Sequence, residues 1–290
     1  SLSAKVAEAI IPQISTEELE KISFVGTSSK EAHEKYLRGR FYWHKFTEDA
    51  LAKAIVYFYE AIAIDPNYAR AFSGVADYHT LLGIVGVLPP KECFEAAKEA
   101  AERAVELDPN LSEAHASKAF AVWAYEWDFR EAEENFRRAV RLNPNYLQTH
   151  EWLAMFYSSA GRYDEALNEI NTALRLNPTS ASIAIIASFV FFKSRRYEEA
   201  LAQNRRALEL EPENGLALRC FAWILPELDR APEAVEYSRR AVEISNRTPM
   251  ALASLGYAFA KTGARGEAEK VLREMLERAV KSYVSPFYLA

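Results

Sequence analysis

Apolar residues recur along this chain at the spacing of one face of an α-helix. In EALNEINTAL, residues 165–174, the positions Ala166, Ile170, Ala173 and Leu174 follow i, i+4, i+7 and i+8, which is the spacing of a single buried helical stripe. A second apolar segment, LQTHEWLAMFYSSAG, precedes it, and Gly161 lies at the turn between the two. The pattern predicts two antiparallel helices of similar length.

The same pattern returns at a nearly constant interval of 34 residues. One set of alanines marks it: Ala54, Ala97, Ala132, Ala166, Ala200, Ala234 and Ala268. A second, mostly alanine, position follows seven residues later, and a proline follows that at Pro66, Pro109, Pro144, Pro178 and Pro212. Alanine lets two helices cross closely, and proline ends a helix because it lacks an N–H. A period of this size predicts a stack of helix pairs.

The register defines about seven helix pairs, because one pair cannot bury its own apolar face and must stack on neighbours. We expect repeats near residues 30–68, 69–111, 112–146, 147–180, 181–214, 215–248 and 249–282. Residues 1–28 fall outside the register and are expected to cap the N-terminal end. Residues 283–290 are expected to start a truncated further helix, whose exposed Phe287, Tyr288 and Leu289 would favour end-to-end contacts between molecules.

Three segments depart from the register. Nine extra residues, in IVGVLPPKE, follow Gly83, and we expect them to form a loop that folds back over its own repeat; contact with a partner is the alternative. One extra residue lies around Trp127. In the first pair, Gly39 takes the small crossing position only if the turn after it is three residues longer.

Eight residues of the segment 147–180 occupy the motif positions of the tetratricopeptide repeat (TPR): Leu153, Ala154, Tyr157, Gly161, Tyr163, Ala166, Ala173 and Pro178. The chain resembles this family over roughly residues 30–282. The resemblance implies an all-α fold, a right-handed superhelical TPR solenoid of about seven helix pairs. It also implies that the first helix of each pair lines a concave face.

The family's groove-facing positions fall mainly on aromatic and thioether side chains here, the types that contribute most at binding hot spots. They are Trp43, Asp77, Phe120, Trp123, Met155, Phe189, Phe192, Arg219, Trp223 and Tyr257. The resemblance therefore implies a groove that binds a peptide or helix of a partner, or of the parent chain. The alternative is that these side chains pack on one another and fill the groove.

Charge and composition narrow the class of partner. The net charge of −6 argues against a nucleic-acid-binding protein, and no stretch approaches the apolar length of a membrane span. Arginine pairs recur at 137–138, 205–206 and 239–240, but glutamates four residues earlier, at 133, 134 and 236, predict ordinary surface ion pairs. Cys93 and Cys220 lie on different helices, which favours a reducing, cytoplasmic location.

The sequence offers no catalytic or cofactor-binding residues. The five histidines are not spaced as metal ligands, and no glycine-rich phosphate loop or nucleophile elbow is present. His115 and His150 lie at equivalent repeat positions, where packing explains them. We therefore predict no enzyme activity, no metal and no cofactor.

Four phrases, YLRGRFYWHK, GVLPPKE, AYEWDF and YVSPF, are similar to the C-terminal repeat region of bacterial multidomain regulators that carry winged-helix, cyclase or kinase domains. This resemblance implies a sensory or regulatory part of a bacterial signalling or transcription regulator. The predicted function is a non-catalytic scaffold that binds a protein or peptide. The alternative is a self-association module, a homodimer formed through the C-terminal face.

Overall fold

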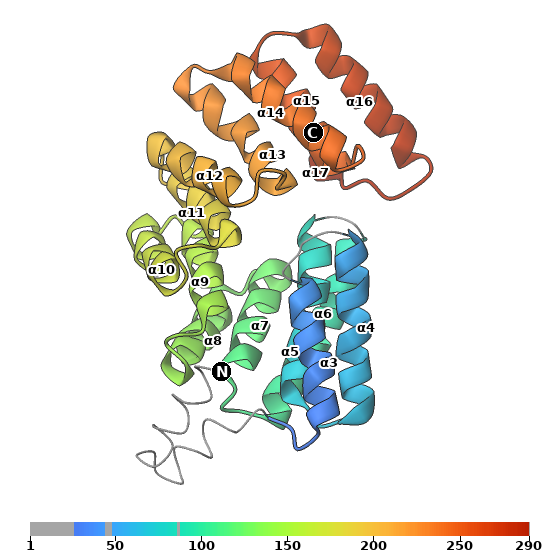
Figure 1. Cartoon of the computed structure of the whole chain (residues 1–290), viewed down its shortest axis with the longest axis vertical. Coiled ribbons are helices and arrows are strands. Elements are labelled where there is room, and N and C mark those ends of the chain that lie inside the picture. Colours follow the sequence, from blue (N-terminus) through green and yellow to red (C-terminus); the bar gives the residue numbers. More distant parts are fainter. Residues whose placement is uncertain (1–25, 44–47, 86–87, 290) are drawn as a thin grey trace, which may run out of the picture.

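The computed structural model describes residues 26–43, 48–85 and 88–289, and in these ranges the chain forms fifteen α-helices and no strand (Figure 1). The expected N-terminal cap lies almost wholly outside the described residues. The helices follow one another as a coil of antiparallel pairs, so the predicted all-α fold is confirmed.

Each repeat consists of a first and a second helix. The pairs are α3 (Lys30–Trp43) with α4 (Glu48–Ile64), α5 (Ala69–Val85) with α6 (Pro90–Leu107), α7 (Ser112–Ala121) with α8 (Phe129–Leu142), α9 (Leu147–Ser159) with α10 (Tyr163–Leu176), α11 (Ala181–Lys193) with α12 (Tyr197–Leu210), α13 (Gly215–Ile224) with α14 (Ala231–Ile244), and α15 (Pro249–Lys261) with α16 (Arg265–Ala279). A π-helical turn, η2 (Val122–Glu126), extends α7, and a 3₁₀ turn, η3 (Leu225–Leu228), extends α13. A short α17 (Pro286–Leu289) ends the chain.

The turns at the repeat prolines are fixed by short side chains. At the end of α6, the Asp108 carboxylate accepts a hydrogen bond from the backbone N–H of Asn110 at 3.0 Å, and at the end of α8 Asn143 does the same for Asn145 at 3.1 Å. Such side chains satisfy backbone donors that the helix leaves unpaired. Each second helix therefore stops at the same point of the register.

Close helix crossings place the alanine series in the core, as the register predicts. Ala54, Ala97, Ala132 and Ala166 are completely buried. Glycine takes this role beside Phe58, because a Cβ at Gly39 would lie 2.5 Å from the Phe58 ring. Gly39 thus occupies the small crossing position, which settles the phase of the first repeat.

The extra residues are absorbed by helices. The predicted apolar loop is wrong for Ile84 and Val85, because α5 continues through both, and α6 begins at Pro90; residues 86–87 lie outside the described ranges. Ile84 and Leu88 remain exposed, so the segment does not bury them against its own repeat. The single extra residue near Trp127 is accommodated by η2, and Trp127 then takes a left-handed conformation with φ 57°.

The C-terminal segment folds back toward the last two repeats. Val284 is buried with Leu255 and Met275, and Tyr288 and Leu289 pack partly against the same cluster. Phe287 is 82% exposed. The expected exposure therefore holds for Phe287 and is wrong for Tyr288 and Leu289, which are half-buried.

Candidate peptide-binding surface

The first helices contact one another in succession and form the inner side of the coil (Figure 1). The coil brings α3 within reach of α9, three repeats later. Arg40 on α3 donates a hydrogen bond from Nη2 to Oε1 of Gln148 on α9 at 2.7 Å. Side chains of α3, α5, α7 and α9 that point to this side therefore meet across the inner surface.

A polar junction closes the N-terminal half of the inner surface. Arg40 Nη1 also donates to Asp77 Oδ2 on α5 at 2.7 Å, and Ser117 on α7 donates to the other oxygen of Asp77 at 2.6 Å. The guanidinium of Arg40 lies 4.8 Å from the ring centre of Trp43. Asp77 and Trp43, both predicted to face a groove, are therefore buried in contacts within the chain.

Aromatic stacking fills the next part of the surface. The Phe120 ring on α7 stacks on Trp152 of α9, with centroids 4.5 Å apart and planes 8° from parallel. Trp123 approaches Phe120 at 5.5 Å and meets Phe156 edge-on at 5.9 Å. In this part of the inner surface, the aromatic side chains pack on one another and fill the groove, as the alternative interpretation of the sequence expects.

The ten predicted groove residues divide into three groups by exposure. Four are buried, and these are Trp43, Asp77, Phe120 and Arg219. Five are half-buried, and these are Trp123, Met155, Phe189, Phe192 and Trp223. Tyr257 is 39% exposed. Trp43, Asp77 and Phe120, in the first three repeats, are therefore too buried to contact a ligand. Most of the predicted groove residues that keep an accessible face lie on α9, α11, α13 and α15.

The side chains that keep an accessible face form a row on successive first helices. Met155, Phe189, Trp223 and Tyr257 lie on α9, α11, α13 and α15 at offsets of 34 residues. We call these four residues the apolar row. Phe192, one turn beyond Phe189, packs against Tyr197 with ring centres 5.6 Å apart. Aromatic and thioether groups at equivalent points of successive first helices present apolar side chains that a partner can cover.

Two charged side chains lie one helical turn before members of the apolar row. Glu151 on α9 is 6% exposed and Arg219 on α13 is 9% exposed, and within the described ranges neither has a hydrogen bond or ion pair. Burial raises the pKa of the Glu151 carboxyl to about 7, although the charge of Arg40 opposes this. Burial lowers the pKa of Arg219.

Sequence reasoning missed Arg40, Gln148 and Glu151. The sequence does not place Arg40 on the inner surface, because it leaves the helical phase of the first repeat ambiguous. The close approach of Gly39 to Phe58 in the structure settles that phase. The sequence does contain a signal that could have predicted Glu151 as an inner-surface residue. Glu151 lies two offsets of 34 residues before Arg219, which is itself a predicted groove residue, with Ile185 between them. No local signal pairs Arg40 with Gln148, because their contact depends on the curvature of the coil.

The two equivalent histidines have structural partners. His115 Nε2 lies 2.9 Å from the Pro109 carbonyl, and His150 Nε2 lies 2.8 Å from the Pro144 carbonyl. His150 Nδ1 faces the Glu169 carboxylate at 2.6 Å. Burial lowers the pKa of His150, but these two acceptors outweigh it and the pKa is raised. Within the part of the chain that the structure describes, no group of three metal-ligating side chains occurs.

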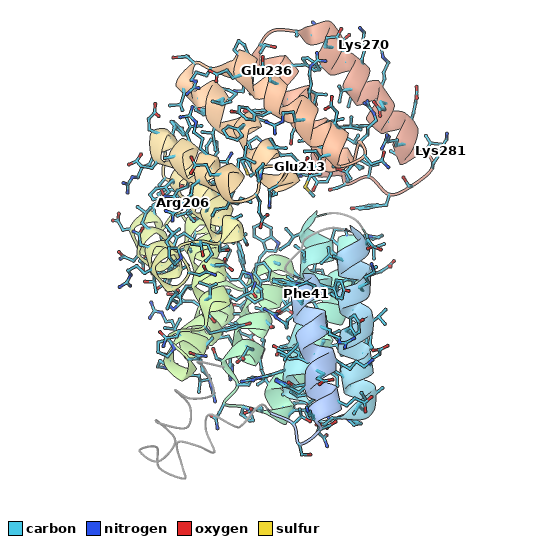
Figure 2. The ribbon with its side chains drawn as sticks, viewed as in Figure 1. Phe41, Arg206, Glu213, Glu236, Lys270 and Lys281 are labelled. Carbon is cyan, nitrogen blue, oxygen red and sulfur yellow. The ribbon has the colours of Figure 1, made fainter. Side chains whose placement is uncertain are left out.

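The arginine pairs connect consecutive repeats. Arg138, Arg206 and Arg240 each donate from Nη2 to the carbonyl of the preceding repeat proline, Pro109, Pro178 and Pro212, at 2.9, 2.6 and 3.4 Å. Figure 2 shows the side chains along the whole coil, with Arg206 marked on α12. The expected i,i+4 ion pair is seen for Arg137 with Glu133 at 2.7 Å. For Arg138 and Arg240, the carbonyl contact replaces the expected ion pair with the glutamate four residues earlier.

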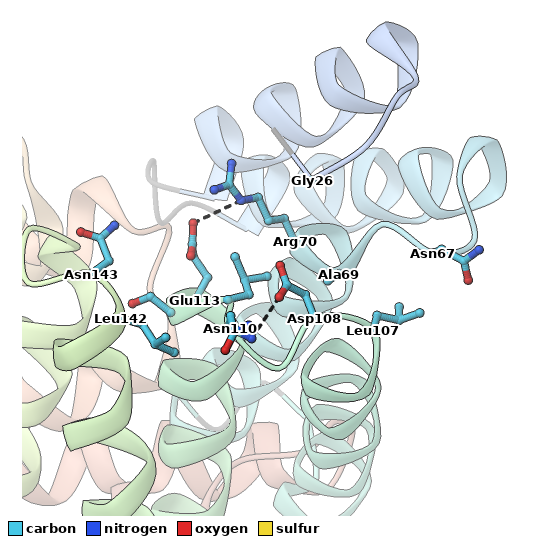
Figure 3. A pocket seen from close by; sticks show the side chains of 12 residues that line it. Gly26, Asn67, Ala69, Arg70, Leu107, Asp108, Asn110, Glu113, Leu142 and Asn143 are labelled. Carbon is cyan, nitrogen blue, oxygen red and sulfur yellow. Dashed lines mark hydrogen bonds and ion pairs between the residues drawn. The ribbon is translucent and has the colours of Figure 1, made fainter. Parts of the chain in front are cut away.

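A wide cavity of about 620 Å³ lies at the edge of the N-terminal repeats, among the turns after α4, α6 and α8 (Figure 3). Its charged groups already have partners. Arg70 pairs with Glu113 at 3.4 Å, and Asp108 accepts from the Asn110 backbone. A ligand in this cavity would have to displace these contacts, whereas the apolar row presents side chains with accessible faces. Separately, no described helix has the length and apolar character to cross a membrane.

Comparison with known proteins supports the fold. Residues 126–187 match the tetratricopeptide repeat family. A comparison with curated proteins finds no significant match. Among solved structures, the APC/C hetero-tetramer Cut9–Hcn1 superposes with a TM-score of 0.68 at 14% identity, covering 91% of this chain and 50% of that chain.

Two bacterial structures are also similar. A thermophilic TPR protein from Thermus thermophilus has a TM-score of 0.54 at 21% identity, covering 67% of this chain and 99% of that one. A TPR protein from Parabacteroides merdae has a TM-score of 0.56 at 11% identity, covering 86% and 93%. The predicted right-handed TPR solenoid of seven helix pairs is confirmed.

Proposed function

We propose that this protein is a non-catalytic scaffold that binds an amphipathic helix or extended peptide of a partner along α11, α13 and α15. The TPR fold supports a role in protein–protein interaction. The apolar row carries the finer proposal, because Phe189, Trp223 and Tyr257 keep accessible faces at equivalent points of three consecutive first helices. Burial of such aromatic surface is the main source of binding energy at interfaces.

The N-terminal half has a different role in this proposal. Arg40, Asp77 and Gln148 satisfy one another across the inner surface, so that half acts as a rigid support. The second arginines are engaged by carbonyls, which favours a protein partner over nucleic acid.

The wider role that we propose is the sensory or regulatory part of a bacterial signalling or transcription regulator. It rests on the four sequence phrases and on the binding surface above. The cytoplasm is the proposed location, because Cys93 and Cys220 are buried and unpaired with each other, as in a reducing compartment.

Calorimetry with a set of synthetic amphipathic peptides tests the proposal. Trp223→Ala and Phe189→Ala should each weaken binding at least about tenfold, since truncating a central aromatic at an interface costs about 2 kcal/mol. Trp127→Ala is the matched control, because Trp127 is 71% exposed in the turn after η2 and outside the apolar row. Equal binding by all four proteins, or by none, contradicts the proposal.

Self-association is a second candidate, favoured by one observation. Exposed Leu272 and Leu276 on α16 and exposed Val280, which directly follows that helix, lie at i, i+4 and i+8, and exposed Phe287 follows at the same end of the chain. Light scattering over a range of concentrations tests it. A mass that rises with concentration in the wild type and not in Leu276→Glu supports a dimer through this face; a constant monomer mass contradicts it.

A further inference from the structure

Two largely buried ionisable side chains of opposite sign, neither with a side-chain hydrogen bond or ion pair among the described residues, occupy the same register position two repeats apart. Glu151 on α9 and Arg219 on α13 are separated by two offsets of 34 residues, and Ile185 on α11 lies at the position between them. Each precedes a member of the apolar row by four residues, Met155 and Trp223 respectively. The inner orientation of α9 at this point follows from Gln148, one turn earlier, which bonds across the coil to Arg40.

Unpaired buried charges are costly, so their presence needs a reason. A largely buried charge without a hydrogen-bond partner is poorly solvated and gains from a ligand group of opposite sign. Elsewhere on the inner surface the chain avoids this cost, since Asp77 accepts hydrogen bonds from both Arg40 and Ser117. Within the described ranges, Glu151 and Arg219 have no such partners. Both charges flank the strip that we propose as the binding surface.

Resting on the proposed function, we propose that the inner surface selects an amphipathic segment that carries a basic side chain toward Glu151 and an acidic side chain toward Arg219, with apolar side chains between them. Each end of the segment would complete a charge pair that the described part of the chain lacks. The apolar part would cover Phe189, which keeps an accessible face. Because the two charges differ in sign, one direction of the bound segment pairs both and the reverse direction opposes like charges.

The geometry of stacked helices sets the spacing of the two ligand charges. Neighbouring packed helices lie about 8–10 Å apart, so two steps from α9 to α13 span about 16–20 Å. This distance corresponds to about 11–13 residues of helix or about 5–6 residues of extended chain. A helix with charges about eleven positions apart, three turns, presents both on one face.

Fluorescence anisotropy with four labelled helical peptides of about 18 residues tests this selection. All share one apolar stripe, and the two positions about eleven residues apart carry Lys and Glu, Lys and Lys, Glu and Glu, or Gln and Gln. We expect the Lys/Glu peptide to bind about tenfold more tightly than the Gln/Gln peptide, which corresponds to about 1.4 kcal/mol. Added salt should reduce this difference.

Two neutral variants assign each contact. Glu151→Gln should remove the advantage given by the peptide lysine and keep that given by the glutamate, and Arg219→Gln should do the reverse. Both should fold, because each removes an uncompensated buried charge, and circular dichroism checks this. Glu209→Gln and Arg205→Gln on α12 are matched controls, since both side chains are exposed on a second helix.

The outcomes separate this inference from the proposed function. If all four peptides bind equally, and Trp223→Ala weakens all four, the charge selection is wrong and the apolar binding surface stands. Binding of Lys/Lys or Glu/Glu as tightly as Lys/Glu also overturns the selection. If none of the four peptides binds, both the selection and the proposed function are overturned.

Discussion

Arg40 on α3 donates a hydrogen bond to Gln148 on α9, 108 residues later in the chain, at 2.7 Å. This bond joins the first repeat to the fourth across the inner side of the coil. Among the described residues of the C-terminal half, no side-chain hydrogen bond joins two first helices; Ser188 bonds to Ala200 and Asn204 to Ala217, each between a first and a second helix. The two halves of the inner surface are therefore built differently.

Removal of Arg40 should destabilise the N-terminal half. Arg40→Ala leaves the buried Asp77 carboxylate without its cation, and breaking a buried pair from one side costs about 3 kcal/mol or more of unfolding free energy. Urea unfolding followed by circular dichroism measures this loss. Lys53→Ala, which removes an exposed pair with Asp49, is the control and should leave the midpoint unchanged. Equal midpoints for Arg40→Ala and wild type contradict the closed junction.

A methyl group at Gly74 should disrupt the crossing with Phe58. A Cβ there would lie 2.6 Å from the Phe58 ring, and forcing atoms into a packed core typically costs about 1–3 kcal/mol. Gly266→Ala on α16 is the control, because its Cβ meets nothing within 4 Å and alanine favours the helix by about 0.5 kcal/mol or more. Thermal unfolding should shift down for the first variant and up, or not at all, for the second. A Gly74→Ala protein as stable as the wild type would show that this crossing is looser than described.

The His150–Glu169 pair should make stability depend on pH. The pKa of His150 is raised in the folded chain above its unfolded value near 6.5, so its contribution is full below that pH and is lost as pH rises through the folded pKa. Compared with wild type, His150→Gln and Glu169→Gln should both show a smaller fall in stability between pH 6 and pH 9. Urea midpoints at several pH values measure the slopes. Unchanged slopes in both variants contradict the charged pair.

Glu151 should cost stability at neutral and alkaline pH. Its folded pKa of about 7 lies above the ordinary 4.5, so the protonated carboxyl favours the fold below pH 4.5 and this advantage is lost as pH rises through 7. The charge of Arg40 opposes this effect of burial but does not cancel it. At pH 8, Glu151→Gln should be more stable than wild type by up to about 3 kcal/mol, and at pH 4 the two should be equal. The same difference at both pH values contradicts burial of an ionisable carboxyl.

The fold follows from local spacing, and this explains why it could be predicted. Alanine at most helix crossings and proline after most second helices are short-range signals. They recur every 34 residues even where the surface side chains differ between repeats. The apolar row shares that register, so the sequence also places Phe189, Trp223 and Tyr257 at equivalent positions of successive first helices. The predicted loop at Ile84 is wrong, because the sequence does not show whether an insertion lengthens helices or the turn between them.

The inner surface of the N-terminal half could not be predicted in the same way. Whether Phe120 faces a groove or stacks on Trp152 depends on how tightly consecutive repeats curve. That curvature is the sum of many small packing differences, and no single residue encodes it. The contact between Arg40 and Gln148 is a consequence of curvature, and it converts predicted groove positions such as Asp77 into core.

The indole N–H resonances of the five tryptophans test the division of the inner surface most directly. Trp43 and Trp152 are buried in the N-terminal half, Trp127 is exposed in the turn after η2, and Trp223 lies in the apolar row. On titration with the Lys/Glu peptide, we expect the Trp223 signal to shift strongly and those of Trp43, Trp127 and Trp152 to stay in place. Shifts of Trp43 and Trp152 with an unchanged Trp223 would contradict the account.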